Sequence, residues 1–136
     1  MEYNYLKPKT NILFSDLDAA FEVHPMKKDL TLKTNSAAIK ESIKNLVLTN
    51  HYERPFHPEI GSNVSKMLFE PMIPVVANYL ETEIYTTITN FEPRVKLSNI
   101  IVESLNDVQA YNVIIQYYEI NATTITTVEF ILERTR

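Results

Sequence analysis

The spacing of the apolar residues changes at Pro93, and this change limits the folds that the chain can adopt. Before the proline, residues 73–91 place apolar side chains at offsets of three and four, which predicts a long amphipathic helix. After it, residues 95–133 follow a period of two and are rich in Ile, Val, Thr and Tyr, which is typical of strands. Proline ends the helix because it lacks a backbone N–H donor and disfavours helical geometry at the preceding Glu92.

The residues after the proline divide into three predicted strands, which are residues 95–103, 111–120 and 124–133. Asn106 and Asp107 supply the first turn, and Asn121 and Ala122 the second. Such short connections predict an antiparallel meander. The middle strand is apolar in both phases, so we expect it to be central, with the long helix covering one face of the sheet.

A shorter helix is predicted upstream. Asn35 or Ser36 can cap its first turn, and apolar residues then recur on one face to about Leu48. Residues 50–63 hold two prolines and the single glycine, which predicts an ordered loop. A helical turn over residues 64–69 is expected to follow.

The first third of the chain is less regular, and short strands are expected at residues 11–14 and 29–34. The predicted fold class is therefore α+β. One long helix and one or two shorter helices pack on a C-terminal three-stranded antiparallel meander, with short strands near the N-terminus. No repeat, low-complexity tract or linker divides the sequence, so a single domain over residues 1–136 is expected.

Composition excludes several classes of chemistry. The 136 residues include one glycine, Gly61, which excludes the glycine-rich loops of P-loop and dinucleotide-binding proteins. There is no cysteine, which excludes disulfides, thiolate nucleophiles and cysteine-ligated metals. The formal net charge of −4 argues against a phosphate-binding surface, and no apolar run is long enough to span a membrane. We therefore expect no cofactor, no nucleic-acid partner and no membrane partner.

Few residues are candidates for catalysis. His51 and His57 share one loop without an evident third ligand, so no metal site is expected. The serines lack a Gly-x-Ser-x-Gly elbow. Carboxylates such as Glu59 and Glu92 leave a glycan-cleaving, lysozyme-like tail enzyme open as the alternative function, because two carboxyl groups suffice for glycoside hydrolysis. No catalytic residue is assigned, and a non-enzymatic role is favoured.

Glu92, Pro93 and Arg94 form a corner where the long helix ends. In one interpretation the corner is a helix stop with a local ion pair, which is common at protein surfaces and contributes little. In the other it is a docking surface, because a preorganised arginine can bond bidentately to a carboxylate or backbone of a partner.

Four short motifs occur in order along the chain. They are Phe14-Ser15-Asp16-Leu17-Asp18, Glu53-Arg54-Pro55-Phe56-His57-Pro58-Glu59-Ile60-Gly61-Ser62, Leu68-Phe69-Glu70, and Phe91-Glu92-Pro93-Arg94. Together they resemble the baseplate wedge family of contractile phage tails, which comprises sheath initiators, has relatives in type VI secretion baseplates and has carried a lysozyme-like label. The similarity extends from about residue 11 to residue 132. Relatives commonly have glycine where Tyr52 stands, so a different turn is expected there.

The resemblance implies a structural role in the virion tail baseplate, with assembly in the host cytoplasm. It implies that Glu92, Pro93 and Arg94 contact the helical core of the wedge, and that the C-terminal sheet accepts a strand from the tail sheath protein. Expected partners are other baseplate wedge proteins, the tail sheath protein and the tail tube or hub. Besides the corner, the residues expected to bind partners are Arg54, Pro55, Phe56, Thr124, Thr126 and Val128.

Overall fold

The computed structural model describes residues 12–18, 20–120 and 122–134. The chain forms two compact units, Met1–Ala38 and Ile39–Arg136, each with its own internal contacts. A single domain over the whole chain stays a prediction. No helix of the described residues combines the length and the apolar content needed to cross a bilayer.

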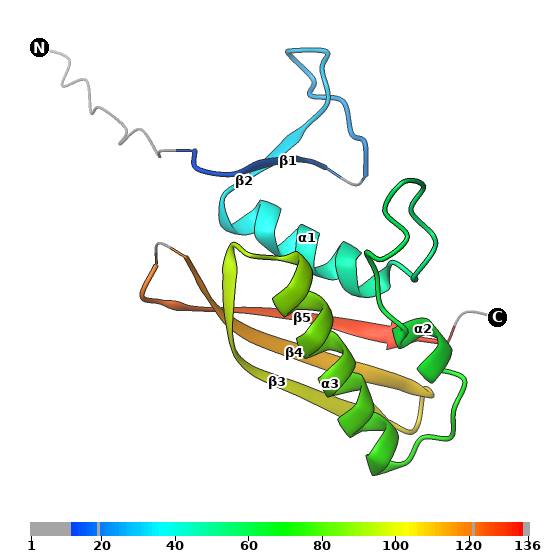
Figure 1. Cartoon of the computed structure of the whole chain (residues 1–136). Coiled ribbons are helices and arrows are strands. Elements are labelled where there is room, and N and C mark those ends of the chain that lie inside the picture. The colour runs from blue at the N-terminus through cyan, green and yellow to red at the C-terminus, as the bar shows by residue number, and fades with distance from the viewer. Residues whose placement is uncertain (1–11, 19, 121, 135–136) are drawn as a thin grey trace, which may run out of the picture. The chain divides into compact units, whose positions relative to one another are not determined.

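The first unit contains a small antiparallel pair of strands, β1 (Ser15–Leu17) and β2 (Leu32–Thr34) (Figure 1). The second of the expected strands, residues 29–34, contains β2. The first lies at Ser15–Leu17 and not at residues 12–14, while Asn11 lies outside the described residues. The Oδ1 atom of Asn35 accepts hydrogen bonds from the backbone N–H groups of Leu13 (2.9 Å) and Phe14 (3.4 Å). The backbone donors just before β1 are therefore bonded to a side chain and not to another strand.

In the described residues, three helices precede the main sheet. They are α1 (Ser36–Leu48), which enters the second unit at Ile39, α2 (Val64–Met67) and α3 (Pro74–Phe91). The predicted apolar face of α1 is confirmed, since its members are buried: Ile39, Ile43, Leu46 and Val47. Proline stands at the start of α3, where its missing N–H costs no intrahelical bond. The buried residues of α3 are Leu80, Ile84, Thr87 and Ile88.

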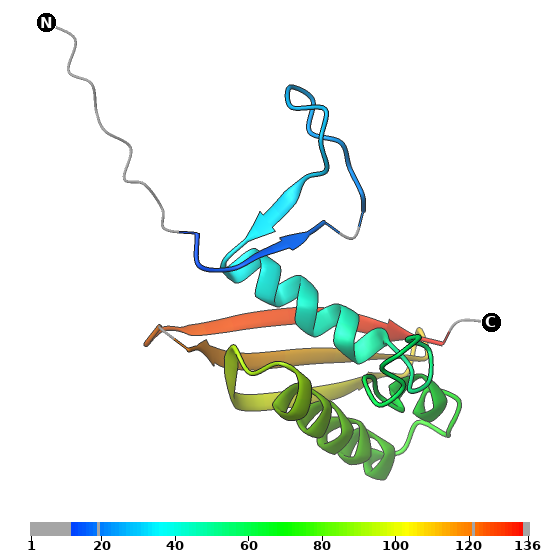
Figure 2. The same ribbon diagram turned by 45° about the horizontal axis from the view of Figure 1, so that its top comes forward.

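The C-terminal third forms the predicted antiparallel meander of β3 (Val95–Leu105), β4 (Ala110–Glu119) and β5 (Ile125–Glu133). The strand order is β3-β4-β5, so the strand that is apolar in both phases is central, as predicted. Figures 1 and 2 show α3 beside β3 and the part of α1 from Ile39 onward beside β5, both on the same face of the sheet. The α+β fold class is confirmed.

The core lies between these helices and the sheet. Alternate residues of β4 point into it and are buried: Tyr111, Val113, Ile115 and Tyr117. The register places Leu132 opposite Tyr111 and Phe130 opposite Val113, so β5 adds buried side chains from the phase that the sequence indicated. Residues of the other phase lie on the uncovered face, where Ile125 and Ile131 remain about half exposed.

Candidate docking surfaces

The corner after α3 holds a buried ion pair. Glu92 is 3% exposed and follows the last residue of the helix, with its backbone N–H donating to the carbonyl oxygen of Ile88 at 2.9 Å. The guanidinium of Arg94 reaches both oxygens of the Glu92 carboxylate, with Nε 2.6 Å from Oε1 and Nη2 2.7 Å from Oε2. The hydroxyl of Ser42 on α1 also donates to Oε2 at 2.6 Å. Both carboxylate oxygens are therefore bonded within the chain.

The surroundings of Glu92 act on its pKa in opposite directions. Burial raises the pKa of the carboxyl group, because a charge in the interior loses its hydration. The hydrogen bonds from Arg94 and Ser42, together with the positive charge of Arg94, outweigh burial, and the pKa lies below the ordinary value for glutamate. The carboxyl group is thus ionised and paired at neutral pH.

The structure shows the ion pair of the first interpretation, and docking at the corner stays a prediction. Glu92 faces the interior and anchors Arg94, as the local ion pair requires. Pro93 is exposed, and 23% of the Arg94 side chain remains exposed. The surface that a partner could touch at this corner therefore consists of Pro93 and Arg94, while Glu92 holds the arginine in place.

The loop of residues 50–63 is closed at its base by hydrogen bonds. The backbone N–H of Ser62 donates to the carbonyl oxygen of Thr49 at 2.8 Å, and its hydroxyl donates to the carbonyl oxygen of Val47 at 2.6 Å. Farther out, the N–H of Tyr52 donates to the carbonyl oxygen of Pro58 at 2.9 Å. The predicted ordered loop is confirmed, and its two ends are pinned together.

Gly61 makes this closure sterically feasible. Its φ is 149°, and a Cβ atom there would lie 2.7 Å from the carbonyl carbon and oxygen of Asn50 and 2.8 Å from the nitrogen of His51. These are backbone atoms and cannot turn away as a side chain can. Only glycine permits so close an approach.

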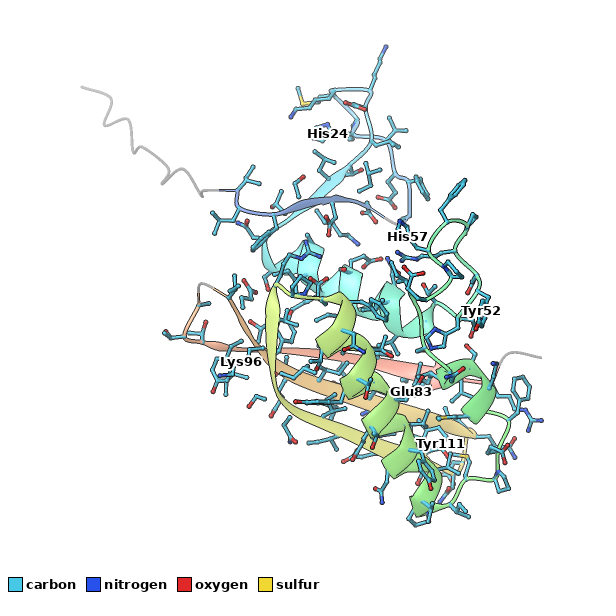
Figure 3. The ribbon with its side chains drawn as sticks, viewed as in Figure 1. His24, Tyr52, His57, Glu83, Lys96 and Tyr111 are labelled. Atoms are coloured by element: carbon cyan, nitrogen blue, oxygen red, sulfur yellow. The ribbon has the colours of Figure 1, made fainter. Side chains whose placement is uncertain are left out.

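A carboxylate of α3, that of Glu83, is hydrogen-bonded to the end of the loop. Oε1 of Glu83 accepts hydrogen bonds from the backbone N–H of Asn63 (2.8 Å) and from its side-chain amide (3.1 Å). The same oxygen lies 3.9 Å from Nε2 of His51. Figure 3 places Tyr52 and His57 on the loop and Glu83 on the helix. The loop is thereby joined to α3.

The far end of the loop presents aromatic rings to solvent. Phe56 is 96% exposed and Tyr52 is 84% exposed, and Arg54 and Pro55 beside them are also exposed. Phe56 and Tyr52 have φ values of 70° and 68°, a left-handed conformation that bulky side chains rarely adopt. Tyr52 thus adopts a conformation that glycine favours.

The hydrogen-bonding phase of β5 follows from the register of the sheet. The N–H of Val102 in β3 donates to Oε1 of Glu81 at 3.2 Å, so it points away from β4. Bonded and non-bonded pairs alternate along an antiparallel ladder, and Val113 opposite Val102 therefore bonds Phe130 of β5. The residues of β5 that turn their N–H and C=O groups away from β4 are then Ile125, Thr127, Glu129, Ile131 and Glu133.

The residues that the sequence singled out near β5 occupy a different phase. Thr126 and Val128 are half-buried on the helix-covered face, and the register directs their backbone groups to β4. Thr124 precedes β5 and is exposed. The outward residues were missed because a period of two assigns side chains to faces, whereas the direction of backbone groups depends on pairing between strands.

The carboxylates of the enzymatic alternative have unsuitable surroundings. Both oxygens of Glu92 are bonded, and Glu59 is an exposed residue whose Oε1 lies 3.2 Å from Nδ1 of His57. A backbone hydrogen bond and His57 lower the pKa of Glu59. The acid of a glycosidase has a raised pKa, whereas the pKa values of Glu59 and Glu92 are both lowered.

The histidines have separate neighbours. His51 lies near Glu83 and His57 pairs with Glu59, although both belong to one loop. Within the part of the chain that the structure describes, no group of three His, Asp or Glu side chains could hold a metal ion.

Sequence comparison identifies relatives. Residues 33–126 match the family profile described as baseplate wedge protein gp25. Baseplate wedge protein gp25 of Enterobacteria phage T4 is 35% identical over 85 residues, which is 62% of this chain. The matched segment spans 64% of the length of that relative, less than two thirds.

Solved structures share the fold. The crystal structure of a Geobacter sulfurreducens protein with a provisional tail-lysozyme name superposes with a TM-score of 0.70 at 19% identity, covering 78% of this chain and 96% of that one. A chain in the cryo-EM structure of the anti-feeding prophage baseplate superposes with a TM-score of 0.62 at 15% identity, covering 90% of this chain and 87% of that one. At these identities the likeness concerns the fold alone.

The fold and the matching profile define a class of protein, the small components of contractile-tail baseplates. The profile covers most of the described second unit, including the closed loop, α3 and the corner. The chain belongs to the baseplate wedge protein gp25 family, as the resemblance predicted. The matched residues 33–126 include three of the four motifs, and the resemblance of Phe14–Asp18 stays a prediction.

Proposed function

We propose that this chain is a structural part of the baseplate wedge that docks on neighbouring wedge proteins and starts the tail sheath by accepting a strand at β5. The observation that carries the proposal is the outer edge of β5. In the described residues β5 pairs with β4 alone, so one side of its backbone is available for strand addition.

The outer edge of β5 suits an extended partner. The outward N–H and C=O groups recur at alternate residues from Ile125 to Glu133, so an incoming strand can pair along the whole of β5. The side chains of this phase lie on the uncovered face, where apolar Ile125 and Ile131 flank the acidic Glu129. A partner strand with apolar residues and a basic residue in the facing phase would match this order.

The loop tip and the corner are the proposed wedge contacts. Arg54, Pro55 and Phe56 project from a loop whose base is fixed, so docking them costs little ordering entropy. At the corner, the buried Glu92 carboxylate fixes the guanidinium of Arg94 beside the exposed Pro93. Exposed aromatic and arginine side chains are the types that contribute most to binding at protein interfaces. The role assigned here is non-enzymatic, which the bonded state of Glu92 supports.

Replacing Thr127 with proline tests the role of the β5 edge. Thr127→Pro removes an outward N–H that makes no bond to β4, and proline is tolerated at such edge positions. Thr127→Val keeps the N–H and the branched shape and is the matched control. We expect baseplates that contain Thr127→Pro to assemble without sheath, whereas Thr127→Val baseplates carry sheath as the wild type does. Electron micrographs showing sheath on Thr127→Pro baseplates at wild-type frequency would contradict the proposal.

A second experiment addresses the wedge contacts. Phe56→Ala removes a ring that is 96% exposed, and Val108→Ala, in the turn after β3, is a control that is 65% exposed. We expect the first variant to be depleted from wedges recovered by pull-down, and the second to be recovered at the wild-type level. Equal recovery of both would remove the loop tip from the proposed interface.

A further inference from the structure

The two edge strands of the main sheet, β3 and β5, differ in whether a helix side chain is bonded to their outer backbone groups. The helix side chain in question is that of Glu81. This residue is on α3, which packs along β3, and Figure 2 shows the two elements side by side. Its Oε1 accepts the hydrogen bond from the backbone N–H of Val102 at 3.2 Å. A helix side chain therefore occupies the position that a neighbouring strand would take at this point of the edge.

Val102 is central in the part of β3 that could accept a strand. Along an antiparallel strand, backbone groups point toward and away from the neighbouring strand at alternate residues. Because the N–H of Val102 points away from β4, the N–H and C=O groups of Ile100 and Ser104 point away from β4 as well. On the N-terminal side the register shifts between Leu97 and Asn99, and this bulge interrupts the edge. The available run is thus short, and its middle donor is already bonded.

The negative charge of Glu81 would also repel the backbone carbonyl oxygen of a strand that approached β3. An incoming strand would aim a carbonyl oxygen at the N–H of Val102, where a carboxylate oxygen now lies. Two oxygens with negative charge density repel each other when both approach a single donor, and displacing the carboxylate leaves it without that bond. Charged side chains directed at an edge are a recognised means of preventing unwanted pairing.

β5 has charged side chains of its own, Glu129 and Glu133, but in the described residues no helix carboxylate is bonded to its outer edge. Within residues 122–134, the described part of the last strand and its flanks, no side chain from a helix is hydrogen-bonded to the outward N–H of Thr127, Glu129 or Ile131. At the β3 edge, which faces α3, the outward N–H of Val102 is therefore bonded to Glu81. At the β5 edge, the outward N–H groups in the described residues are still available to a partner strand.

We propose that Glu81 blocks strand addition at β3, so that the sheet accepts a strand at β5 only and grows in one direction. This inference rests on the proposed function for the use of β5, but the block at β3 is a separate property that can be measured on the isolated protein. Its purpose is specificity: a wedge part with two open edges could pair with a second copy of itself through β3.

The test compares two substitutions at Glu81. Glu81→Met keeps the length of the side chain and removes the acceptor, whereas Glu81→Gln keeps an acceptor oxygen and is the matched control. We expect Glu81→Met to self-associate with rising concentration, reaching about twice the monomer mass if two β3 edges pair about a twofold axis. Light scattering after size-exclusion chromatography should show the wild type and Glu81→Gln at the same lower mass. A folded Glu81→Met that stays at that mass overturns the proposal.

A rescue identifies the surface involved. Ser104→Pro removes an outward N–H of β3 and should return the Glu81→Met protein to the mass of the wild type, because proline cannot extend an edge ladder. Self-association that persists in the double variant occurs through another surface and also overturns the proposal.

A measurement on the unmodified protein covers the case in which Glu81→Met fails to fold. Amide hydrogen exchange should be at least about tenfold slower at Val102 than at Ile131, after correction for sequence, because only the first outward amide is bonded. Equal protection at the two amides contradicts the block. The Thr127→Pro experiment reports on sheath assembly and not on self-association, so a failure of the β3 block and a failure of the proposed function give different results.

Discussion

Arg94 holds both oxygens of a carboxylate that the protein has buried, with Nε 2.6 Å from Oε1 and Nη2 2.7 Å from Oε2 of Glu92. The pair joins the end of α3 to the start of β3, and Ser42 extends it to α1. Three elements of the second unit thus meet at one charged group. Surface ion pairs rarely matter for stability, but an interior pair does when one partner is lost.

We expect Arg94→Ala to lower the free energy of unfolding by about 2–3 kcal/mol, because the buried Glu92 carboxylate loses its countercharge. Glu92→Gln/Arg94→Met removes the charge and the countercharge together and should cost less than Arg94→Ala alone. Urea denaturation of both variants measures the two values. A larger loss in the double variant would show that the pair does not act as a unit.

The same double variant separates docking from folding. Because it leaves no lone interior charge, it should stay folded by circular dichroism while losing the exposed guanidinium. We expect it to be depleted from assembled wedges if Arg94 touches a partner. Recovery at the wild-type level would assign the corner to stability alone.

Acid should weaken the protein in part through Glu92. Its pKa is depressed in the folded state, so its contribution is fully present above the unfolded value, about 4.3, and is lost as the pH falls through the lower folded pKa. Glu92→Gln should therefore lose less stability than the wild type between pH 5 and the acid limit of the titration, roughly pH 2. Other carboxyl groups also titrate there, Asp18 and Glu59 among them, and the difference between the two curves isolates Glu92. Parallel curves would contradict the assignment.

Tyr52→Gly should leave the free energy of unfolding unchanged or raise it by up to about 1 kcal/mol. Glycine relieves the left-handed conformation at φ 68°, and its greater freedom in the unfolded chain offsets part of the gain. Tyr52→Val is the control, since a β-branched residue should tolerate this φ less well than tyrosine. Thermal denaturation ranks the three proteins, and a glycine variant less stable than the valine variant would refute the explanation.

Gly61→Ala should destabilise the protein by about 3 kcal/mol, because its Cβ would meet backbone atoms at 2.7 Å. Glu59→Ala, an exposed change in the same loop, should shift the unfolding midpoint little. A mild effect at Gly61 would mean that the two ends of the loop can separate without loss of the fold.

The sequence was sufficient for the elements whose signal is local. The apolar spacing of α3 and the proline that follows it defined the longest helix, and the alternation of Ile, Val and Thr located three strands to within about two residues, the usual uncertainty of a boundary. The short strand near residues 11–14 was misplaced because Asn35, far along the chain, supplies the hydrogen bonds there. Hydrogen bonds between residues far apart in the chain do not produce a periodic pattern in the sequence.

The candidate surfaces were predicted less completely for the same reason. The motif Glu92-Pro93-Arg94 indicated a corner with paired charges, but it gave no sign of the hydrogen bond from Ser42, fifty residues earlier. Glu81 carried no signal at all, since a glutamate in a helix is ordinarily a solvated residue and its bond to Val102 exists only once helix and sheet are packed.

The closed base of the loop at residues 50–63 has an evolutionary consequence. Its base is held by Gly61, Ser62 and the bonds to Val47 and Thr49, while the side chains of Arg54, Pro55 and Phe56 at the tip are exposed and make none of these bonds. Mutations at the tip can therefore accumulate without unfolding the scaffold. Because the tip belongs to the motif that resembles the wedge family although its side chains make none of the closing bonds, selection for recognition and selection for folding can act on different residues of one loop.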